Sequence, residues 1–322
     1  MKVGIIGGAG FVGTRLAAVM EDAGKDFHLF DKSLENSNYL DITDPKSFAS
    51  LPHLDAVINL AAEHRDDVSP KSLYDLVNVE GSRNLCNFCR QRGINTIIFT
   101  SSVAVYGFAP EGTDESGEIN YFNDYGRTKY LAENVYREWY EEDPENRNLT
   151  IIRPTVIFGE GNRGNVFNLL NQIASGRFLM FGNGKNRKSM AYVQNVAEFI
   201  QFSTKLSGYN LYNYIDKPDL DMNTLVGTVR ATLFKKSGVG LRFPALLGVL
   251  AGYGFDVLAF LLRKKLPISS IRVKKFMGTT SFNTSIPKTG FKARVDLLEG
   301  LRKTLNYEFI EDNTEKPTFI TE

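Results

Sequence analysis

A glycine-rich segment, VGIIGGAGFVG, opens the chain at residues 3–13 and restricts the folds available to it. It lies between an apolar run, KVGII, and a helical pattern that begins near Phe11. A glycine turn between strand and helix lets the backbone approach a pyrophosphate, and the helix N-terminus adds amide donors. The segment therefore predicts a dinucleotide-binding α/β unit whose contacts are Gly7, Gly10, Phe11 and Val12.

A single acidic residue suggests which dinucleotide is bound. The second apolar run, FHLF, ends at Asp31, about twenty residues beyond the last glycine. A carboxylate at that position accepts hydrogen bonds from ribose hydroxyls and repels a 2′-phosphate. This favours NAD over NADP, although Lys32, which we also expect at the cofactor, would offset part of the repulsion.

Strand-like and helical patterns alternate through the first half of the chain. Apolar runs such as TIIF are apolar throughout, as strands buried on both faces require. We predict an α/β fold with a doubly wound parallel sheet (Rossmann type) and a smaller mixed lobe. The expected division is a cofactor-binding and catalytic domain at 1–155, a substrate-binding lobe interleaved with the sheet at 156–307, and a polar tail at 308–322.

Composition excludes several classes of partner and site. The chain has 322 residues and a formal net charge of +1, so no overall field favours nucleic acid. Cys86 and Cys89 lie three apart in a predicted helix, which supplies half of a zinc site and poor disulfide geometry. We expect them to be buried and expect no metal. The chain opens directly on a predicted strand, so we expect no signal peptide and a cytoplasmic location.

One apolar stretch stands apart, at residues 243–262. It is close to the length that spans a bilayer, with Arg242 before it and Arg263, Lys264 and Lys265 after it. Asp256 and three glycines within it argue against a simple span. We predict helices that cover the lobe, and weak membrane contact through this stretch is the alternative.

A tyrosine and a lysine four residues apart suggest acid–base chemistry. Tyr125 and Lys129 fall on one face of a predicted helix, and Ser101 and Ser102 follow the strand-like run TIIFT. Lowering a tyrosine pKa from about 10 to about 7 requires roughly 4 kcal/mol. A cation about 4 Å away at an effective dielectric of 20 supplies about that much. Packing is the other explanation, and the spacing alone does not decide between the two.

The chain resembles the extended short-chain dehydrogenases/reductases, specifically the nucleotide-sugar epimerase/dehydratase family. The matching motifs, in order, are GGAGFVG (7–13), Asp31, LDI (40–42), NLAA (59–62), NVEGSRNL (78–85), SSVAVYG (101–107), YGRTK (125–129), RPTVIFGEGN (153–162) and GNGKNRKSMAYVQNVAEFI (182–200).

This resemblance implies residue roles. Tyr125 would be the general acid/base, Ser102 would bind the substrate oxygen, and Lys129 would hold the nicotinamide ribose. The other implied cofactor contacts are Asp41, Ile42, Leu60, Ala61, Ala62, Asn78 and Pro154, and the implied substrate contacts are His64, Asn165, Arg187 and Lys188. Lys188 stands where related enzymes place an arginine that binds the substrate diphosphate. A lysine cannot make the bidentate contact to phosphate that an arginine makes, so that contact would have to come from Arg187.

The resemblance also narrows the reaction. Val103 and Ala104 replace the Asp-Glu pair that dehydratases of this family carry, and neither can move a proton. We therefore predict an NAD-dependent nucleotide-sugar 4-epimerase that acts through a 4-keto sugar, in polysaccharide biosynthesis. The runner-up is an NAD(P)-dependent nucleotide-4-keto-sugar reductase or dehydrogenase. A steroid-type dehydrogenase and a non-catalytic dinucleotide sensor are further alternatives. Relatives are often dimers through residues 71–92 and 123–140, so we expect a homodimer.

Overall fold

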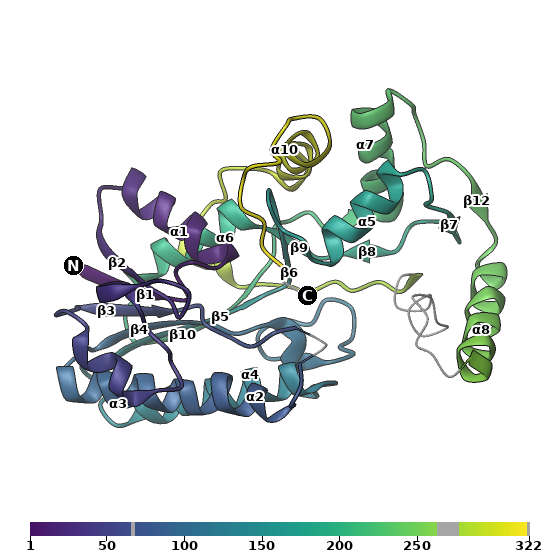
Figure 1. Cartoon of the computed structure of the whole chain (residues 1–322). Coiled ribbons are helices and arrows are strands. Elements are labelled where there is room, and N and C mark those ends of the chain that lie inside the picture. Colours follow the sequence, from purple (N-terminus) through teal and green to yellow (C-terminus); the bar gives the residue numbers. More distant parts are fainter. Residues whose placement is uncertain (66–67, 263–276, 321–322) are drawn as a thin grey trace.

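A six-stranded parallel sheet forms the centre of the computed structural model, which describes residues 1–65, 68–262 and 277–320 (Figure 1). The strands lie in the order β10–β5–β4–β3–β1–β2. Their bounds are β1 Lys2–Ile6, β2 Asp26–Phe30, β3 Ala56–Asn59, β4 Thr96–Thr100, β5 Asn148–Pro154 and β10 Tyr209–Tyr214. Strand β2 lies on one side of β1, whereas β3, β4, β5 and β10 follow on the other side. A ligand-binding crevice is expected where the strand order reverses in this way. The predicted doubly wound α/β fold is confirmed.

Helices cover both faces of this sheet (Figure 1). On one face lie α1 (Phe11–Asp22) and α6 (Val193–Ser203), and on the other α3 (Gly81–Arg92) and α4 (Asp124–Glu141). Successive side chains of a strand point to opposite faces. In β4, Ile98 accordingly joins the core under α1 and α6, whereas Ile97 and Phe99 join the core under α3 and α4. The double burial explains why the centre of β4, Ile97–Phe99, is apolar throughout.

The helix predicted over 71–92 is interrupted by a wider turn. It consists of α2 (Ser72–Tyr74), a π-helical segment η3 (Asp75–Glu80) and then α3. The π segment carries Asn78, whose side-chain amide donates to the carbonyl of Glu63 at 3.0 Å and to the hydroxyl of Thr128 at 3.0 Å. The extra residue in the turn thus ties the loop after β3 to helix α4.

The lobe is built from short strand pairs and helices. Strands β6 (Val156–Phe158) and β9 (Met190–Tyr192) pair in parallel, as do β7 (Met180–Phe181) and β12 (Arg242–Phe243), while β8 (Arg187–Lys188) and β11 (Leu220–Asp221) are antiparallel. The lobe helices are α5 (Asn165–Ala174), α7 (Met222–Phe234), α8 (Ala245–Leu262) and α10 (Leu297–Phe309). Short 3-10 turns occur at η1 Asn36–Asn38, η2 Pro45–Ser50, η4 Val103–Tyr106 and η5 Ile286–Thr289. Between these segments the chain returns to the sheet as α6 and β10.

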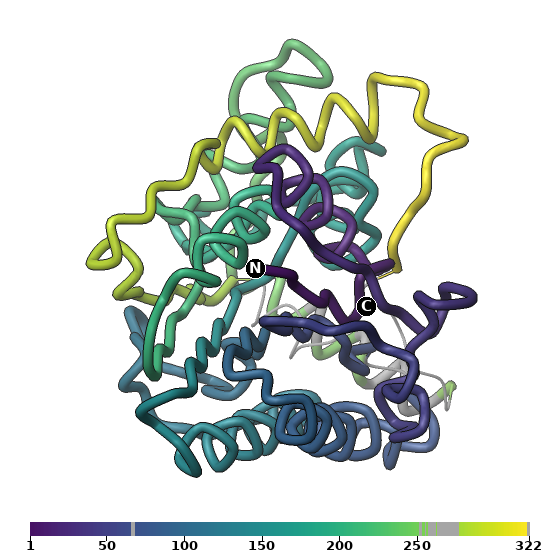
Figure 2. Tube along the Cα trace, turned by 90° about the vertical axis from the view of Figure 1, so that its left-hand side faces the viewer, coloured from purple at the N-terminus to yellow at the C-terminus, as the bar shows by residue number. Residues whose placement is uncertain are grey.

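The last described part of the chain is held to the fold. Helix α10 extends to Phe309, and Phe319 then pairs its backbone with Gly161 and Arg163, at 2.8 Å in both directions. The Phe319 ring lies 5.7 Å from that of Phe11, and Figure 2 shows this part of the chain beside the N-terminal part. The backbone bonds and the ring contact together fix the segment around Phe319.

The two cysteines and the apolar stretch occupy different parts of the fold. Cys86 and Cys89 are free and buried in α3, and burial raises the pKa of Cys86 to about 12, so both behave as packing residues. The stretch 243–262 contains α8. No helix within residues 1–65, 68–262 and 277–320 combines the length and apolarity needed to cross a bilayer.

Candidate active site

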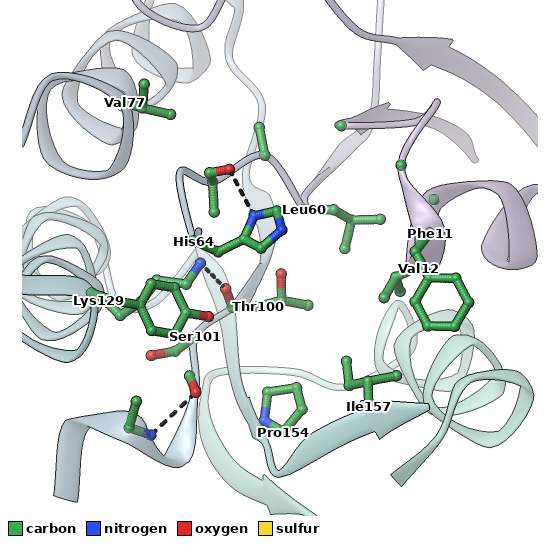
Figure 3. A pocket seen from close by; sticks show the side chains of 18 of the residues that line it. Phe11, Val12, Leu60, His64, Val77, Thr100, Ser101, Lys129, Pro154 and Ile157 are labelled. Carbon is green, nitrogen blue, oxygen red and sulfur yellow. Dashed lines mark hydrogen bonds between the residues drawn. The ribbon is translucent and has the colours of Figure 1, made fainter. Parts of the chain in front are cut away.

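A cavity of about 620 Å³ lies at the carboxyl ends of the sheet strands, under the lobe. The predicted site residues that line it are Gly7, Gly10, Phe11, Val12, Asp31, Lys32, Asp41, Ile42, Leu60, Ala61, Ala62, His64, Ser102, Tyr125, Lys129, Pro154 and Asn165. Figure 3 shows His64 and Lys129 on one side of this space and Phe11, Val12 and Ile157 on the other. The glycine turn and the serine, tyrosine and lysine therefore share one site.

The glycine turn packs so closely on its own backbone that no side chain fits at two of its positions. Gly7 has φ +81°, and a Cβ added there would lie 2.7 Å from the backbone nitrogen of Ala61. A Cβ on Gly13 would lie 2.4 Å from the carbonyl oxygen of Gly7. Helix α1 begins directly after Gly10 without a side-chain cap. The first amides of α1 are thus available to a phosphate, which fits the pyrophosphate of a dinucleotide.

Asp31 is held at the end of β2 beside this turn. One carboxylate oxygen accepts from the backbone of Ala9 at 3.3 Å, and the other accepts from the backbone and hydroxyl of Ser33 at 2.9 and 2.8 Å. Further along the cavity, Asp41 accepts from Thr43, and the carbonyl of Ile42 accepts from Asn84. These bonds hold the carboxylates of Asp31 and Asp41 where they could accept from ribose hydroxyls. They also hold Ile42, whose apolar side chain suits contact with an adenine.

Lys129 reaches the site from the interior of α4. Its ammonium donates to the carbonyl of Thr100 at 2.6 Å and lies 4.6 Å from the centre of the Phe99 ring (Figure 3). Only 2% of the residue is exposed. Burial lowers the pKa of Lys129 to about 7, and the nearby Glu133 partly opposes that shift. The cation that would acidify Tyr125 therefore predominates below about pH 7.

Tyr125 and Ser102 meet the cavity from two different elements. Tyr125 lies in the first turn of α4, which Asn123 caps by accepting from the backbone of Gly126 at 2.9 Å. Ser102 follows β4 and caps η4, where its hydroxyl accepts from Ala104 at 3.1 Å. That bond leaves the Ser102 hydroxyl proton available to donate to a ligand.

A buried ion pair underlies the catalytic side chains. The Glu133 carboxylate is fully buried and accepts from Nε and Nη2, along one edge of the Arg153 guanidinium, at 2.8 and 2.6 Å. It also accepts from Ser101 at 2.5 Å and from Arg137 at 2.7 Å. Arg153 in turn donates to Tyr106 at 2.7 Å. This network joins α4, β4 and β5 directly below the residues that face the cavity.

His64 presents an unused nitrogen to the same space. Its Nδ1 lies 3.3 Å from the carbonyl oxygen of Ala62, which can only accept, so Nδ1 carries the proton. Burial lowers the pKa of His64, which favours the neutral ring. Its Nε2 is buried, and no hydrogen-bond partner reaches it in the part of the chain that the structure describes. Nε2 can therefore accept a hydrogen bond from a bound hydroxyl.

Three of the predicted site residues lie outside the cavity wall. Asn78 is buried behind it, in the contacts with Glu63 and Thr128 given above. Arg187 is exposed on β8. Lys188 donates to the carbonyl of Gly278 at 2.7 Å and to the hydroxyl of Thr280 at 3.3 Å, and Thr280 lines the cavity. Lys188 thus adjoins the site through Thr280.

Some lining residues were not expected from the sequence. Thr280 and Phe282 come from a segment without any recognisable motif, so no signal pointed to them. Asn162 and Thr155 lie within the matched motif RPTVIFGEGN and could have been inferred from it. Across the described residues, no three His, Cys, Asp or Glu side chains gather so that they could hold a metal ion.

The burial of Lys129 predicts a dependence of stability on pH. The pKa of Lys129 is about 7 in the fold against an ordinary value of 10.5, so the unfolded chain binds more protons between these values. Stability should therefore rise as the pH increases from about 7 to about 10, by at most about 1.4 kcal/mol per pH unit. The Lys129→Met variant should lack this rise when urea unfolding is compared at pH 6.5 and pH 9. If the free energy of unfolding changed equally between pH 6.5 and pH 9 in both proteins, the burial of the Lys129 cation would be contradicted.

Comparison with known proteins places this geometry in context. The family model "NAD dependent epimerase/dehydratase family" matches residues 3–210. The chain is 49% identical, over 99% of its own length and 98% of the relative's, to the N-acetyl-α-D-glucosaminyl-diphospho-ditrans,octacis-undecaprenol 4-epimerase of Escherichia coli O157:H7.

More distant relatives share the fold or part of the sequence. The decarboxylating sterol-4-α-carboxylate 3-dehydrogenase of Saccharomyces cerevisiae is 28% identical over 94% of this chain and 96% of that protein. Among solved structures, the UDP-Glc/GlcNAc 4-epimerase of Campylobacter jejuni superposes with a TM-score of 0.73 at 17% identity, covering 95% of this chain and 98% of the other.

Proposed function

Since one family model spans more than half of it, the chain belongs to the NAD-dependent epimerase/dehydratase family, and we propose that it inverts C4 of a diphosphate-linked sugar. The predicted family, an enzyme of the sugar 4-epimerase type and NAD as its cofactor are confirmed by the comparisons. The reductase alternative needs the same catalytic groups. The relative that matches nearly the whole chain at 49% identity is an epimerase, which favours epimerisation.

The observation that supports this reaction is the meeting of Tyr125, Ser102 and Lys129 in the cavity that the glycine turn also lines. NAD, when bound along that turn, supplies the acceptor and donor of hydride for C4. Tyr125 is placed to take the proton of the sugar's 4-hydroxyl and to return it. Ser102 donates a hydrogen bond to the same oxygen, and Lys129 favours the phenolate by its charge.

The cofactor contacts follow from the same geometry. The turn at Gly7, Gly10 and Gly13 would hold the pyrophosphate, and Asp31 would accept from the adenosine ribose. Lys129 would bind the nicotinamide ribose, and His64 is placed to accept from a hydroxyl of the sugar or of that ribose. The lobe would shut water out of the cavity above these groups.

Relatives differ in the carrier to which the sugar is linked. The relative at 49% identity acts on a sugar linked through diphosphate to undecaprenol, whereas the solved relative from Campylobacter jejuni acts on UDP-sugars. We favour an N-acetylhexosamine linked through diphosphate to a polyprenol, since the closer sequence match covers almost the entire chain.

A substrate panel tests both halves of the proposal. The enzyme should convert polyprenyl-diphospho-N-acetylglucosamine to its 4-epimer without net formation of NADH. We expect kcat/KM to be at least about tenfold higher for this substrate than for UDP-N-acetylglucosamine, because remote binding energy contributes to the rate. Isomers are separated by chromatography, and NADH is followed by absorbance. Stoichiometric NADH turnover would instead indicate a dehydrogenase or reductase.

We also propose a homodimer, a cytoplasmic location, a division of the chain at residues 155 and 307, and weak membrane contact through 243–262. The last belongs to the same proposal as the lipid carrier, because a polyprenyl-linked sugar reaches an enzyme from a membrane surface.

A further inference from the structure

Helix α8 presents a row of leucines to solvent. Leu246, Leu247, Leu250 and Tyr253 are all about half exposed or more, with Leu246 at 67% and Leu250 at 56%. Spacings of three and four residues place them on one side of the helix. Single exposed leucines are common on protein surfaces, but a row of this kind on one helix marks an interaction surface.

The side of α8 that carries Gly248 is fixed to the lobe. Gly248 is buried against Phe181, and a Cβ added to Gly248 would come within 2.9 Å of that ring. The Phe181 ring packs at a tilt of 36° against Phe243, with 6.0 Å between ring centres, and Arg242 donates to Asn223 at 2.7 Å. These contacts join α8 to β7, β12 and α7, so the exposed leucines are held on a supported helix.

One cation lies beside the start of this helix. Arg242 is exposed and stands in β12, three residues before α8 begins. An apolar helix face that begins beside a cation suits a bilayer, where leucines enter the acyl boundary and the cation meets headgroups.

The position of α8 relates this surface to the active site. In Figure 1 the chain enters β1 at the left, so the carboxyl ends of the parallel strands, and the cavity, face the side on which α8 stands. The described chain resumes at residue 277 and reaches the cavity wall at Thr280 and Phe282. The sheet edge that forms the cavity and the helix that carries the leucines therefore lie toward the same side of the molecule.

We propose that the exposed face of α8, with Arg242 beside its start, docks the enzyme on a bilayer and so presents the cavity to a membrane-held substrate. This rests on the proposed function in so far as the substrate is lipid-linked. Helix α8 would lie along the surface, since its 18 residues extend about 27 Å and no described helix is suited to crossing. The sugar and its diphosphate then leave the headgroup layer while the polyprenyl chain stays in the membrane.

Two matched double variants of the full chain test this docking. The first is Leu246→Gln with Leu250→Gln on α8. The control is Ile310→Gln with Ile320→Gln, which removes two leucine-sized side chains of similar exposure, 59% and 70%, elsewhere on the surface. Binding is measured by flotation with vesicles of phosphatidylglycerol and phosphatidylcholine. The α8 variant should lose about tenfold or more in vesicle binding, and the control should bind like the unchanged enzyme.

Kinetics separate docking from catalysis. With a water-soluble, short-chain prenyl-diphospho-sugar, all three proteins should have the same kcat and KM. With the polyprenyl-linked substrate in vesicles, the apparent KM of the α8 variant alone should rise about tenfold. Equal vesicle binding by the α8 variant and the unchanged enzyme would overturn the proposal. So would loss of a dimer in the α8 variant without lipid, which would make this face a contact between copies. Vesicle binding without any epimerisation would refute the proposed function alone.

Discussion

The Tyr125→Phe variant should lose about 10²–10⁴-fold in kcat, the range that a positioned general acid or base contributes. The change removes one oxygen and keeps the ring at the first turn of α4, so the cavity and its cofactor contacts should persist. Loss of the rate with little change in NAD binding would assign the oxygen to proton transfer. The two quantities are measured by isomer formation and by fluorescence titration with NADH.

A neighbouring tyrosine provides the control for this experiment. Tyr130 lies on the same helix, outside the cavity wall as far as the described residues show, and its ring contacts Tyr121 and Arg137. Tyr130→Phe keeps that ring and should retain nearly full activity. If Tyr125→Phe also retained full activity, the proton would have to move by another route, and the proposed mechanism would fail.

The Glu133→Gln variant should unfold far more easily than the unchanged protein. Its carboxylate is fully buried and pairs with Arg153, whose side chain is also buried. Removing one charge leaves the other in a medium that solvates it poorly, which costs about 3–5 kcal/mol. Because Glu133 is the group that raises the pKa of Lys129, the variant should also lower that pKa further. The free energy of unfolding is obtained from urea titrations.

A surface carboxylate gives the matched comparison. Glu142 also pairs with two arginines, Arg90 and Arg147, but its side chain is 43% exposed. Glu142→Gln should therefore cost about 1 kcal/mol or less. The double variant Glu133→Gln, Arg153→Met should lose less free energy of unfolding than the two single variants lose in sum. The reason is that neither Glu133 nor Arg153 then leaves a buried partner charge unpaired. A loss below about 1 kcal/mol for Glu133→Gln alone would contradict the buried pair.

The sequence was most informative where a chemical task restricts the residue type at one place in the chain. Only glycine avoids the clash of Gly13 with the Gly7 carbonyl, so the turn was visible as a motif. The same holds for Asp31 at the end of β2, and for Tyr125 and Lys129 on one helix face. Strands buried on both faces, such as β4, were visible because their central residues, here Ile97–Phe99, are apolar without alternation.

Features that depend on distant parts of the chain were not visible. The π turn at η3 follows from the reach of Asn78 to Glu63 and Thr128, neither of which is adjacent in sequence. Thr280 and Phe282 reach the cavity only because the chain returns there after α8. The ion pair between Glu133 and Arg153 joins two elements twenty residues apart, and each residue alone resembles an ordinary surface charge.

The return of the chain to the central sheet has a consequence during synthesis. β5 pairs with β4 on one side and with β10 on the other, yet β10 is translated only after β6–β9, α5 and α6. A nascent chain that has left the ribosome up to the lobe therefore carries β5 as an open edge, with unpaired amides and carbonyls. Until residue 214 emerges, that edge is a template for association with other unfinished chains and a natural substrate for chaperones.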